Sequence, residues 1–247
     1  MDYDNFSKFY DIFTDNIDYE YYSEKIIGLF EKYDKKPTIL LDLACGTGGF
    51  SYEFAKKNIE VIGVDRSDGM LNAAINKNTE RKNNPLFLNQ SAEDLDLFGT
   101  VDGAVCLLDS VNHITDKNVL LRIFKKVSLF LEPERLFMFD VNTLYKHKML
   151  LGDNTFIREN KNTFCVWQNQ TDENGTVDVF LDFFVQKENG DYERFCEDFS
   201  EVIYSDEELK SMLLSAGFET LDVIDCKSEK NPDELSQRVL YIVRKIK

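Results

Sequence analysis

A short glycine-rich stretch, "ILLDLACGTGGF", sets the strongest limit on how this chain can fold. It begins at Ile39, passes one acid, Asp42, and then reaches Gly46, Gly48 and Gly49 just before a segment of helical periodicity. This order predicts a buried strand that turns abruptly into a helix. The backbone N–H groups at the start of such a helix are unpaired and lie at the positive end of its dipole. The turn can therefore hold an anionic or zwitterionic ligand.

Strands and helices alternate through the first 143 residues. A first helix is expected in "DYEYYSEKIIGLFEKY", which ends before Pro37. The expected strands cover 38–43, 59–64, 86–89, 101–108 and 136–141, and the expected helices cover 49–57, 67–78 and 116–130. This alternation predicts an α/β fold with a doubly wound, mostly parallel, Rossmann-like sheet covered by helices on both faces.

The rhythm changes between about residues 144 and 204. Three runs of alternating apolar and polar residues, "TFIRENKNTFCVWQNQ", "TVDVFLDFFVQKE" and "DYERFCEDFSEVIY", are separated by "DENG" and "ENGD". Asn-Gly between such runs indicates β-hairpins, because both turn positions require positive φ. We therefore expect an inserted antiparallel sheet over 144–204, which caps the substrate side of a main domain made of 1–143 and 205–247.

The segment after the insertion completes the main sheet. "SDEELKSMLLSAGF" predicts a capped helix closed by Gly217. "ETLDVIDCK" and "QRVLYIVRKI" predict two strands that form a terminal hairpin. With the five earlier strands they make a seven-stranded sheet whose last strand is antiparallel.

Charge and cysteine content narrow the class of partner. The chain has 29 Lys and Arg against 45 Asp and Glu, a formal net charge of −16, and no strong basic cluster, so nucleic acid is disfavoured and a neutral or cationic small molecule is expected. The five scattered cysteines are expected as buried thiols in a reducing compartment, without a zinc site. No apolar run approaches the length of a membrane span, so we expect a cytoplasmic protein. Nothing in the sequence indicates an oligomeric state.

Two nucleoside cofactors suit the glycine turn. Counted from Gly46, a dinucleotide-binding G-x-G-x-x-G pattern meets Ser51 at its third position, so the match is partial. Asp65 closes the second strand, where an acid can accept hydrogen bonds from the ribose hydroxyls of NAD or of S-adenosylmethionine. Asp42 before the glycines and the closing helix-strand-strand element favour S-adenosylmethionine.

Three motifs carry a family resemblance over nearly the whole chain. "LLDLACGTG", "VIGVDRSDGML" and "LKSMLLSAGFETLDV" resemble motifs of class I S-adenosylmethionine-dependent methyltransferases. The inserted sheet and "FYDIF" resemble a small-molecule branch that includes glycine N-methyltransferase, nucleotide-sugar N-methyltransferases and uncharacterised bacterial members. The resemblance implies S-adenosylmethionine as the cofactor and a small-molecule acceptor, foremost an amine.

The resemblance also assigns the cofactor site. The backbone of 43–48 would cradle the methionine and ribose, Asp65 would bind the ribose hydroxyls, and Arg66 and Met70 would flank the adenine. "NQSAEDL" occupies the place from which the family contacts the adenine amino group, and Tyr10 matches a tyrosine that lies over the cofactor. The full set implied is Tyr10, Asp42, Leu43, Ala44, Cys45, Gly46, Thr47, Gly48, Asp65, Arg66, Met70, Gln90, Ser91, Ala92, Glu93 and Leu107.

The chemical end of the site is expected at "CLLDSVNHI", which ends the fourth strand. Ligands of open parallel sheets bind beyond the carboxyl ends of the strands, so Asp109 and His113 would face the methyl group. His113 matches a histidine of the resembling amine methyltransferases and could accept the acceptor's proton, or could instead only cap the next helix. The expected substrate residues are Tyr21, Tyr22, Asn142 and Trp167, although Trp167 also suits the core of the insertion. His147 is expected in a loop.

Other functions remain open at this point. Asp109, Asp140 and Asn142 end strands and could bind Mg²⁺ as in catechol-type enzymes, but Val141 separates the acid from the amide, so no metal is expected. The remaining alternatives are an RNA methyltransferase, an NAD-dependent oxidoreductase and a cofactor-binding partner protein without catalysis.

Overall fold

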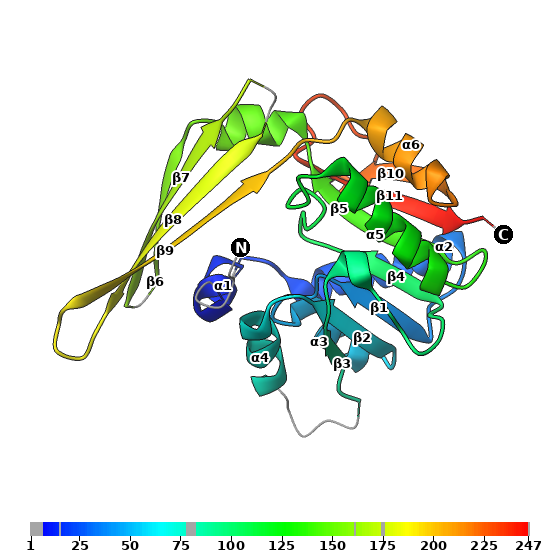
Figure 1. The fold of residues 1–247 in the computed structure, drawn as a ribbon, viewed down its shortest axis with the longest axis horizontal. Helices are drawn as coiled ribbons and strands as arrows, with labels where there is room; N and C mark the ends of the chain where they lie inside the picture. Colours follow the sequence, from blue (N-terminus) through cyan, green and yellow to red (C-terminus); the bar gives the residue numbers. More distant parts are fainter. Residues whose placement is uncertain (1–6, 15, 78–82, 161, 174–175, 247) are drawn as a thin grey trace.

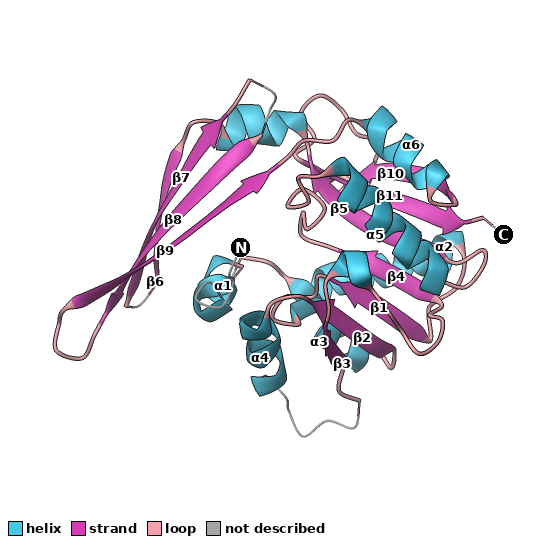
Figure 2. Ribbon diagram, viewed as in Figure 1, coloured by secondary structure: helices cyan, strands magenta, loops and turns pink. Residues whose placement is uncertain are grey.

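The computed structural model describes residues 7–14, 16–77, 83–160, 162–173 and 176–246. The described chain forms two sheets, one of seven strands and one of four (Figure 1). Figure 2 shows helices on the seven-stranded sheet, whereas the four-stranded sheet extends away from it. No helix of the described chain is long and apolar enough to cross a membrane.

The seven-stranded sheet has the order β10-β11-β5-β4-β1-β2-β3. Its strands β1 to β5 pair in parallel, and β11 pairs antiparallel with both β5 and β10. The predicted sheet and terminal hairpin are thereby confirmed. The strands are β1 (Ile39–Leu43), β2 (Glu60–Asp65), β3 (Leu86–Asn89), β4 (Gly103–Cys106), β5 (Leu136–Asn142), β10 (Phe218–Asp225) and β11 (Arg238–Lys245).

Helices cover the two faces of this sheet. One apolar core contains α5 (Lys117–Phe130) and α6 (Asp206–Ser215), and a second contains α2 (Tyr19–Tyr33) and α3 (Gly49–Lys56). On α5 the buried residues recur at helical spacing, at Leu120, Ile123, Phe124 and Val127, which explains why this segment lies flat on the sheet. The short helices α1 (Ser7–Phe13) and α4 (Asp68–Asn76) lie beside each other near the β3 edge.

The insertion is an antiparallel sheet in the order β6-β7-β8-β9. Its strands are β6 (Thr155–Asn160), β7 (Thr163–Thr171), β8 (Val177–Gln186) and β9 (Tyr192–Glu201). Alternate residues of β8 are buried and pack with Phe9 of α1, whose ring stacks on Phe183 at 4.6 Å. In the "ENGD" turn Gly190 has φ +89°, as predicted, but Asn189 does not have positive φ, so the expectation for both turn positions is wrong at Asn189. Asn174 and Gly175 of "DENG" lie outside the described residues.

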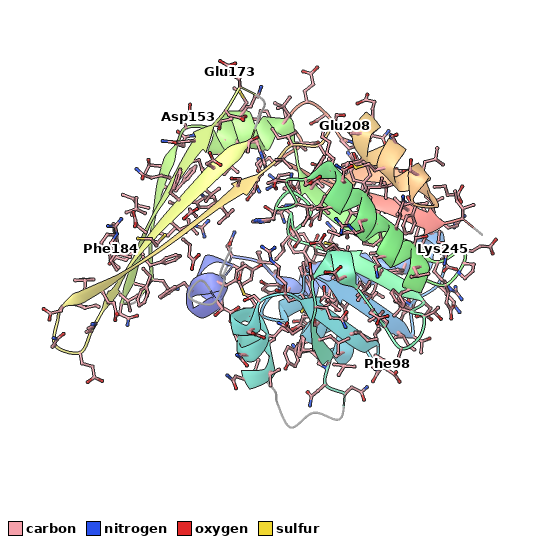
Figure 3. The ribbon with its side chains drawn as sticks, in the orientation of Figure 1. Phe98, Asp153, Glu173, Phe184, Glu208 and Lys245 are labelled. Carbon is pink, nitrogen blue, oxygen red and sulfur yellow. The ribbon has the colours of Figure 1, made fainter. Side chains whose placement is uncertain are left out.

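The outer part of the antiparallel sheet extends past the rest of the molecule. In Figure 3, Phe184 of β8 lies near this outer end, and Phe98 lies on the far side of the parallel sheet. The inner part carries Trp167, Leu181 and Phe199, which face a cavity beside the glycine turn. Only the inner part of the sheet therefore contributes to the candidate site.

Four details of the sequence interpretation are wrong. "TFIRENKNTFCVWQNQ" is not one strand but the two strands β6 and β7, because the chain reverses at "NKN", of which residue 161 lies outside the described part. A π-helical turn, η2 (Lys146–Leu151), precedes β6 where strand was expected. His147 lies in that π-helical turn rather than in a loop, and it is fully buried. Cys196 is exposed, since it occupies a solvent-facing position of β9.

Candidate functional site

The glycine turn has the tight geometry that its sequence predicts. Ala44, Gly46 and Gly48 all have positive φ, at +56°, +54° and +76°. A Cβ on Gly48 would lie 2.9 Å from the ring of Phe87, so a side chain there would meet both strain and a clash. Gly48 also forms the N-cap of α3 without a side-chain cap, which leaves backbone N–H groups at the helix start.

Asp65 at the end of β2 fixes the conformation of this turn. Its Oδ2 accepts a hydrogen bond from the Gly46 N–H at 2.9 Å, and its Oδ1 accepts one from the Ser67 N–H at 2.9 Å. Burial raises the pKa of Asp65, although the two backbone hydrogen bonds oppose the shift. Each oxygen has acceptor capacity beyond these bonds.

Asp42 lies beneath the turn rather than on its surface. Its Oδ2 accepts a hydrogen bond from the Ser51 hydroxyl at 2.5 Å, which ties the end of β1 to the first turn of α3. Burial raises the pKa of Asp42 to about 7, although the hydrogen bond from Ser51 opposes the shift. Asp42 therefore orders the turn from behind.

We expect the substitution Asp42→Asn to raise the melting temperature at pH 8. In an unfolded chain an Asp carboxyl has a pKa of about 3.9, so folding with a pKa near 7 favours the protonated form. The contribution of Asp42 to stability is then fully present below about pH 4 and is lost as the pH rises through about 7. Asn stays neutral and its Oδ1 can still accept from Ser51.

Thermal unfolding of both proteins at several pH values checks this expectation. The advantage of Asp42→Asn should grow between about pH 4 and 7 and then level off. Asp68→Asn removes an exposed acid near the same edge and serves as the control. A difference in melting temperature that is the same at pH 4.5 as at pH 8 would contradict the expectation.

A cavity of about 950 Å³ joins the glycine turn to the end of β4. Its volume lies in the range of small-molecule sites. Most of the predicted site residues line it: Tyr10, Tyr22, Ala44, Gly46, Asp65, Arg66, Met70, Gln90, Ser91, Ala92, Glu93, Leu107, Asp109, His113 and Trp167. Within the described chain, the wall does not include Tyr21, Asp42, Leu43, Cys45, Thr47, Gly48 or Asn142.

The exceptions have simple structural reasons. Asp42, Leu43, Thr47 and Asn142 are at most 2% exposed and pack behind the wall. Tyr21 is 52% exposed, because neighbouring positions on a helix point in different directions and Tyr22 is the one that faces the cavity. Gln90 does line the cavity, but its carboxamide is used within its own loop, where it bonds the backbone of Asp96.

A buried ionic group lies at the end of the cavity beyond β4. Arg238, the first residue of β11, contacts Asp109 Oδ1 at 2.8 Å and Asp140 Oδ2 at 3.7 Å. Asp140 accepts hydrogen bonds from the backbone N–H groups of Leu108 and Asp109, both of which have positive φ. Burial alone would raise the pKa of Asp109, but Arg238, with Lys146 and His113, holds it well below its usual value. Asp109 is therefore a fixed anion.

Asn142 connects this ionic group to the insertion. Its Nδ2 donates to Asp109 Oδ2 at 2.5 Å and to Glu201 Oε2 at 3.3 Å, while its Oδ1 accepts from Lys146 Nζ at 2.8 Å. Burial lowers the pKa of Lys146. The amide thus sits between the two carboxylates instead of facing the cavity.

Several wall residues could not be identified from the sequence. Lys146, Glu201 and Arg238 were missed, as was the loop between β10 and β11, which contributes 226–229, 233 and 235–237 to the wall. Arg238 had one local signal, a charge at the start of a strongly apolar strand. Glu201 had none, since acids are frequent along β9.

The magnesium interpretation does not fit these contacts. Asp109, Asp140 and Asn142 do lie together, but a guanidinium and an ammonium already contact them. Across the described residues, no three His, Cys, Asp or Glu side chains form a group that could hold a metal ion.

Comparison with known proteins gives a consistent result. The family described as "Methyltransferase domain" matches residues 40–134. YqeM of Bacillus subtilis (strain 168), which its name assigns to the methyltransferases, is 31% identical over 251 residues, covering 100% of this chain and 98% of YqeM. A crystal structure of an S-adenosylmethionine-dependent methyltransferase from Clostridium acetobutylicum ATCC 824 shares 32% identity and a TM-score of 0.88 over 99% of each chain. The sugar N-methyltransferase KedS8 from Streptoalloteichus sp ATCC 53650 has the same fold at 19% identity, with a TM-score of 0.78 over 96% of this chain and 93% of KedS8.

Proposed function

This chain belongs to the class I S-adenosylmethionine-dependent methyltransferases, and from that premise we propose that it methylates a small-molecule amine. Bound S-adenosylmethionine would supply a methyl group on a positively charged sulfur: the lone pair of an acceptor attacks the methyl carbon in line, the C–S bond breaks, and S-adenosylhomocysteine leaves. The observation that carries the proposal is a single cavity of about 950 Å³ that is lined by Gly46, Asp65, Asp109 and His113.

The residues at the glycine turn fit this cofactor. The backbone of Gly46 faces the cavity without a side chain, and its φ of +54° disfavours any other residue there. Asp65 is half-buried at the same wall and retains acceptor capacity for the two ribose hydroxyls. We assign the methionine and ribose parts to the backbone of 43–48, and the adenine to Arg66, Met70 and the loop from Gln90 to Glu93.

His113, at the Asp109 end of the cavity, is the proposed general base. An ammonium group has no lone pair to offer, so it must lose a proton before it can accept a methyl group. An imidazole titrates near neutrality and can take that proton. We assign orientation of the acceptor to Asp109, which Arg238 and Asn142 hold from two sides, and lining of its apolar part to Tyr22 and Trp167.

Charge favours an amine over an anionic acceptor. Arg238 and Lys146 at this end already contact Asp109 and Asn142, while the carboxylate of Glu201 lies on the wall. The net charge of −16 also raises the local concentration of cations around the protein. The sugar N-methyltransferase KedS8, which has the same fold, supports an amine acceptor by analogy.

Two further assignments concern the role of the insertion and the cellular compartment of the protein. We assign 144–204 to a cap on the acceptor side of a domain made of 1–143 and 205–247, because Trp167, Leu181 and Phe199 line the same cavity. The five cysteines are free, which is typical of a reducing compartment, so we assign the activity to the cytoplasm.

A labelled-methyl screen tests the proposal. The protein is incubated with methyl-labelled S-adenosylmethionine and either a cell extract of small metabolites or total RNA, with protein-free mixtures as controls. We expect label to enter cationic small molecules in the metabolite mixture and to stay out of RNA. Label in RNA alone, or only in neutral methyl ethers, would contradict the proposal. Failure of transfer with every fraction would favour a cofactor-binding protein without catalysis.

A further inference from the structure

Both histidines of the chain contact one buried carboxylate. The sequence contains only two histidines, His113 and His147, which are 34 positions apart. Glu201 at the end of β9 is 5% exposed and lies between them. Its Oε1 is 3.8 Å from His113 Nε2, and its Oε2 is 3.1 Å from His147 Nε2.

The carboxylate is held in place on its far side. Oε2 of Glu201 accepts a hydrogen bond from Asn142, which also donates to Asp109. His147 is completely buried in η2 and packs behind the carboxylate. The Glu201 carboxylate is therefore anchored through Oε2, while Oε1 faces His113.

The backbone ties the same strand end to the loop that carries His113. The Val202 N–H donates to the Asn112 carbonyl at 2.9 Å, and Asn112 Nδ2 donates back to the Val202 carbonyl at 2.8 Å. The imidazole of His113 also packs on Phe199 of β9, with ring centroids 4.9 Å apart. The residues directly before His113 and directly after Glu201 are thus joined, so neither side chain can shift far without the other.

His113 has few polar partners besides Glu201. Its Nδ1 is buried and has no hydrogen-bond partner among the residues that the structure describes. The 3.8 Å separation at Nε2 is longer than a hydrogen bond, and such contacts often tighten when the substrate binds. Glu201 Oε1 is thus the carboxylate oxygen placed to meet His113 Nε2.

We infer that Glu201 is a positioning residue that orients His113 and balances the positive charge His113 gains on taking the acceptor's proton. The inference rests on the proposed function, in which His113 is the base. It gives the insertion a direct part in the chemistry, because Glu201 belongs to its last strand.

Charged groups of both signs lie near His113. Asp109 is on the same loop, and Asp140 of β5 lies beside Arg238. The cations are Lys146 of η2 and Arg238 of β11, which contact Asn142 and Asp109, and His147 lies on the other side of Glu201. A substitution confined to Glu201 leaves these groups in place, so a comparison with the parent protein isolates its effect.

The test is a titration of the two imidazoles by nuclear magnetic resonance. Only two sets of histidine signals exist, and His113→Gln and His147→Gln assign them. In Glu201→Gln we expect the midpoint of the His113 titration to fall by roughly one pH unit, because the neutral amide no longer stabilises the imidazolium. Asp198→Asn removes an exposed acid from the same strand and should change this midpoint by no more than a few tenths of a unit.

This experiment needs no acceptor, so its outcome is independent of the acceptor proposal. An unchanged His113 midpoint in folded Glu201→Gln protein would overturn the inference. If the Glu201→Gln protein does not fold, the same titration of the Glu201→Asp protein provides the test. This variant keeps the charge but withdraws it by one methylene, so a smaller fall is expected and an unchanged midpoint again contradicts the inference.

Kinetics with an acceptor found by the screen separates positioning from a purely structural role. Glu201→Gln should lower kcat and move the acidic limb of the pH–rate profile to lower pH. Combined with His113→Gln it should cause little further loss, because Glu201 acts through His113. A normal kcat in Glu201→Gln, or a full additional loss in the double variant, would overturn the positioning role.

Discussion

The His113→Gln protein should bind S-adenosylmethionine nearly as well as the parent and turn over about 10²–10⁴-fold more slowly, which is the usual cost of removing a general base. Glutamine has a similar size and a hydrogen-bonding tip, but it cannot accept a proton. His113 lies on the cavity wall at the Asp109 end, whereas the proposed cofactor contacts lie at the glycine turn. The loss should therefore fall on kcat and leave cofactor affinity unchanged.

Steady-state kinetics with an identified acceptor, and calorimetry with S-adenosylmethionine, check both halves of this expectation. Asp109→Asn should cause a smaller loss of kcat, because Asp109 is proposed to orient the acceptor rather than to take its proton. Asp198→Asn serves as the control for a change in surface charge. A His113→Gln protein that methylates at the parent rate across neutral pH would contradict the role of His113. The base would then have to be sought first at Tyr10 and Tyr22, which line the cavity.

The parts of the fold that local sequence determines could be predicted closely. The turn from Leu43 to Gly48 needs positive φ at two glycines, and each parallel strand is a short branched apolar run. Helix α5 shows its buried face in its spacing, and Ser205 with Glu208 forms the capping box that its sequence predicts. Such features depend on residues within one turn or strand, so the sequence alone was enough to identify them.

The errors in the insertion arose where local signals were weak. The reversal at "NKN" lacks a glycine, so β6 and β7 were interpreted as one strand. The η2 segment "KHKMLL" is rich in Lys, which suggests exposure, yet His147 within it is fully buried beside Glu201. Burial of that imidazole depends on β9, more than 50 positions later in the chain. The local pattern of apolar and polar residues carries no information about a contact at that separation.

The candidate site was predictable at its cofactor end and much less so at its acceptor end. Gly46 and Asp65 belong to adjacent strand ends, and parallel pairing brings such ends together. The acceptor end gathers Asp109, Lys146, Glu201 and Arg238 from four separate segments. Their meeting depends on β11 inserting beside β5 and on β9 returning to the loop after β4. The spacing of residues in the sequence does not predict either of these two contacts.

The second large effect is expected at Asp65, where replacement with Ala should weaken binding of S-adenosylmethionine about 100-fold. Hydrogen bonds to a charged acceptor contribute about 1.5–3 kcal/mol each, so the lower end of this range for two ribose contacts, about 3 kcal/mol, corresponds to roughly 100-fold in affinity. The substitution also removes the bonds that Asp65 accepts from Gly46 and Ser67, which loosens the turn. Because these contacts are made equally in the ground and transition states, kcat at saturating cofactor should change much less.

Asp68→Asn is the matched control for this substitution. Asp68 is an exposed acid three positions later, at the start of α4, and it lies outside the described cavity wall. Its replacement removes the same charge from the same edge of the sheet without touching the turn. Affinity for S-adenosylmethionine should then stay within about twofold of the parent.

Isothermal titration calorimetry of the parent, Asp65→Ala and Asp68→Asn proteins tests the central claim, that S-adenosylmethionine is held at the glycine turn by Asp65. We expect the parent and Asp68→Asn proteins to bind S-adenosylmethionine alike, Asp65→Ala to bind it about 100-fold more weakly, and none of them to prefer NAD. Parent affinity in folded Asp65→Ala protein, or binding of NAD in place of S-adenosylmethionine, would contradict the claim.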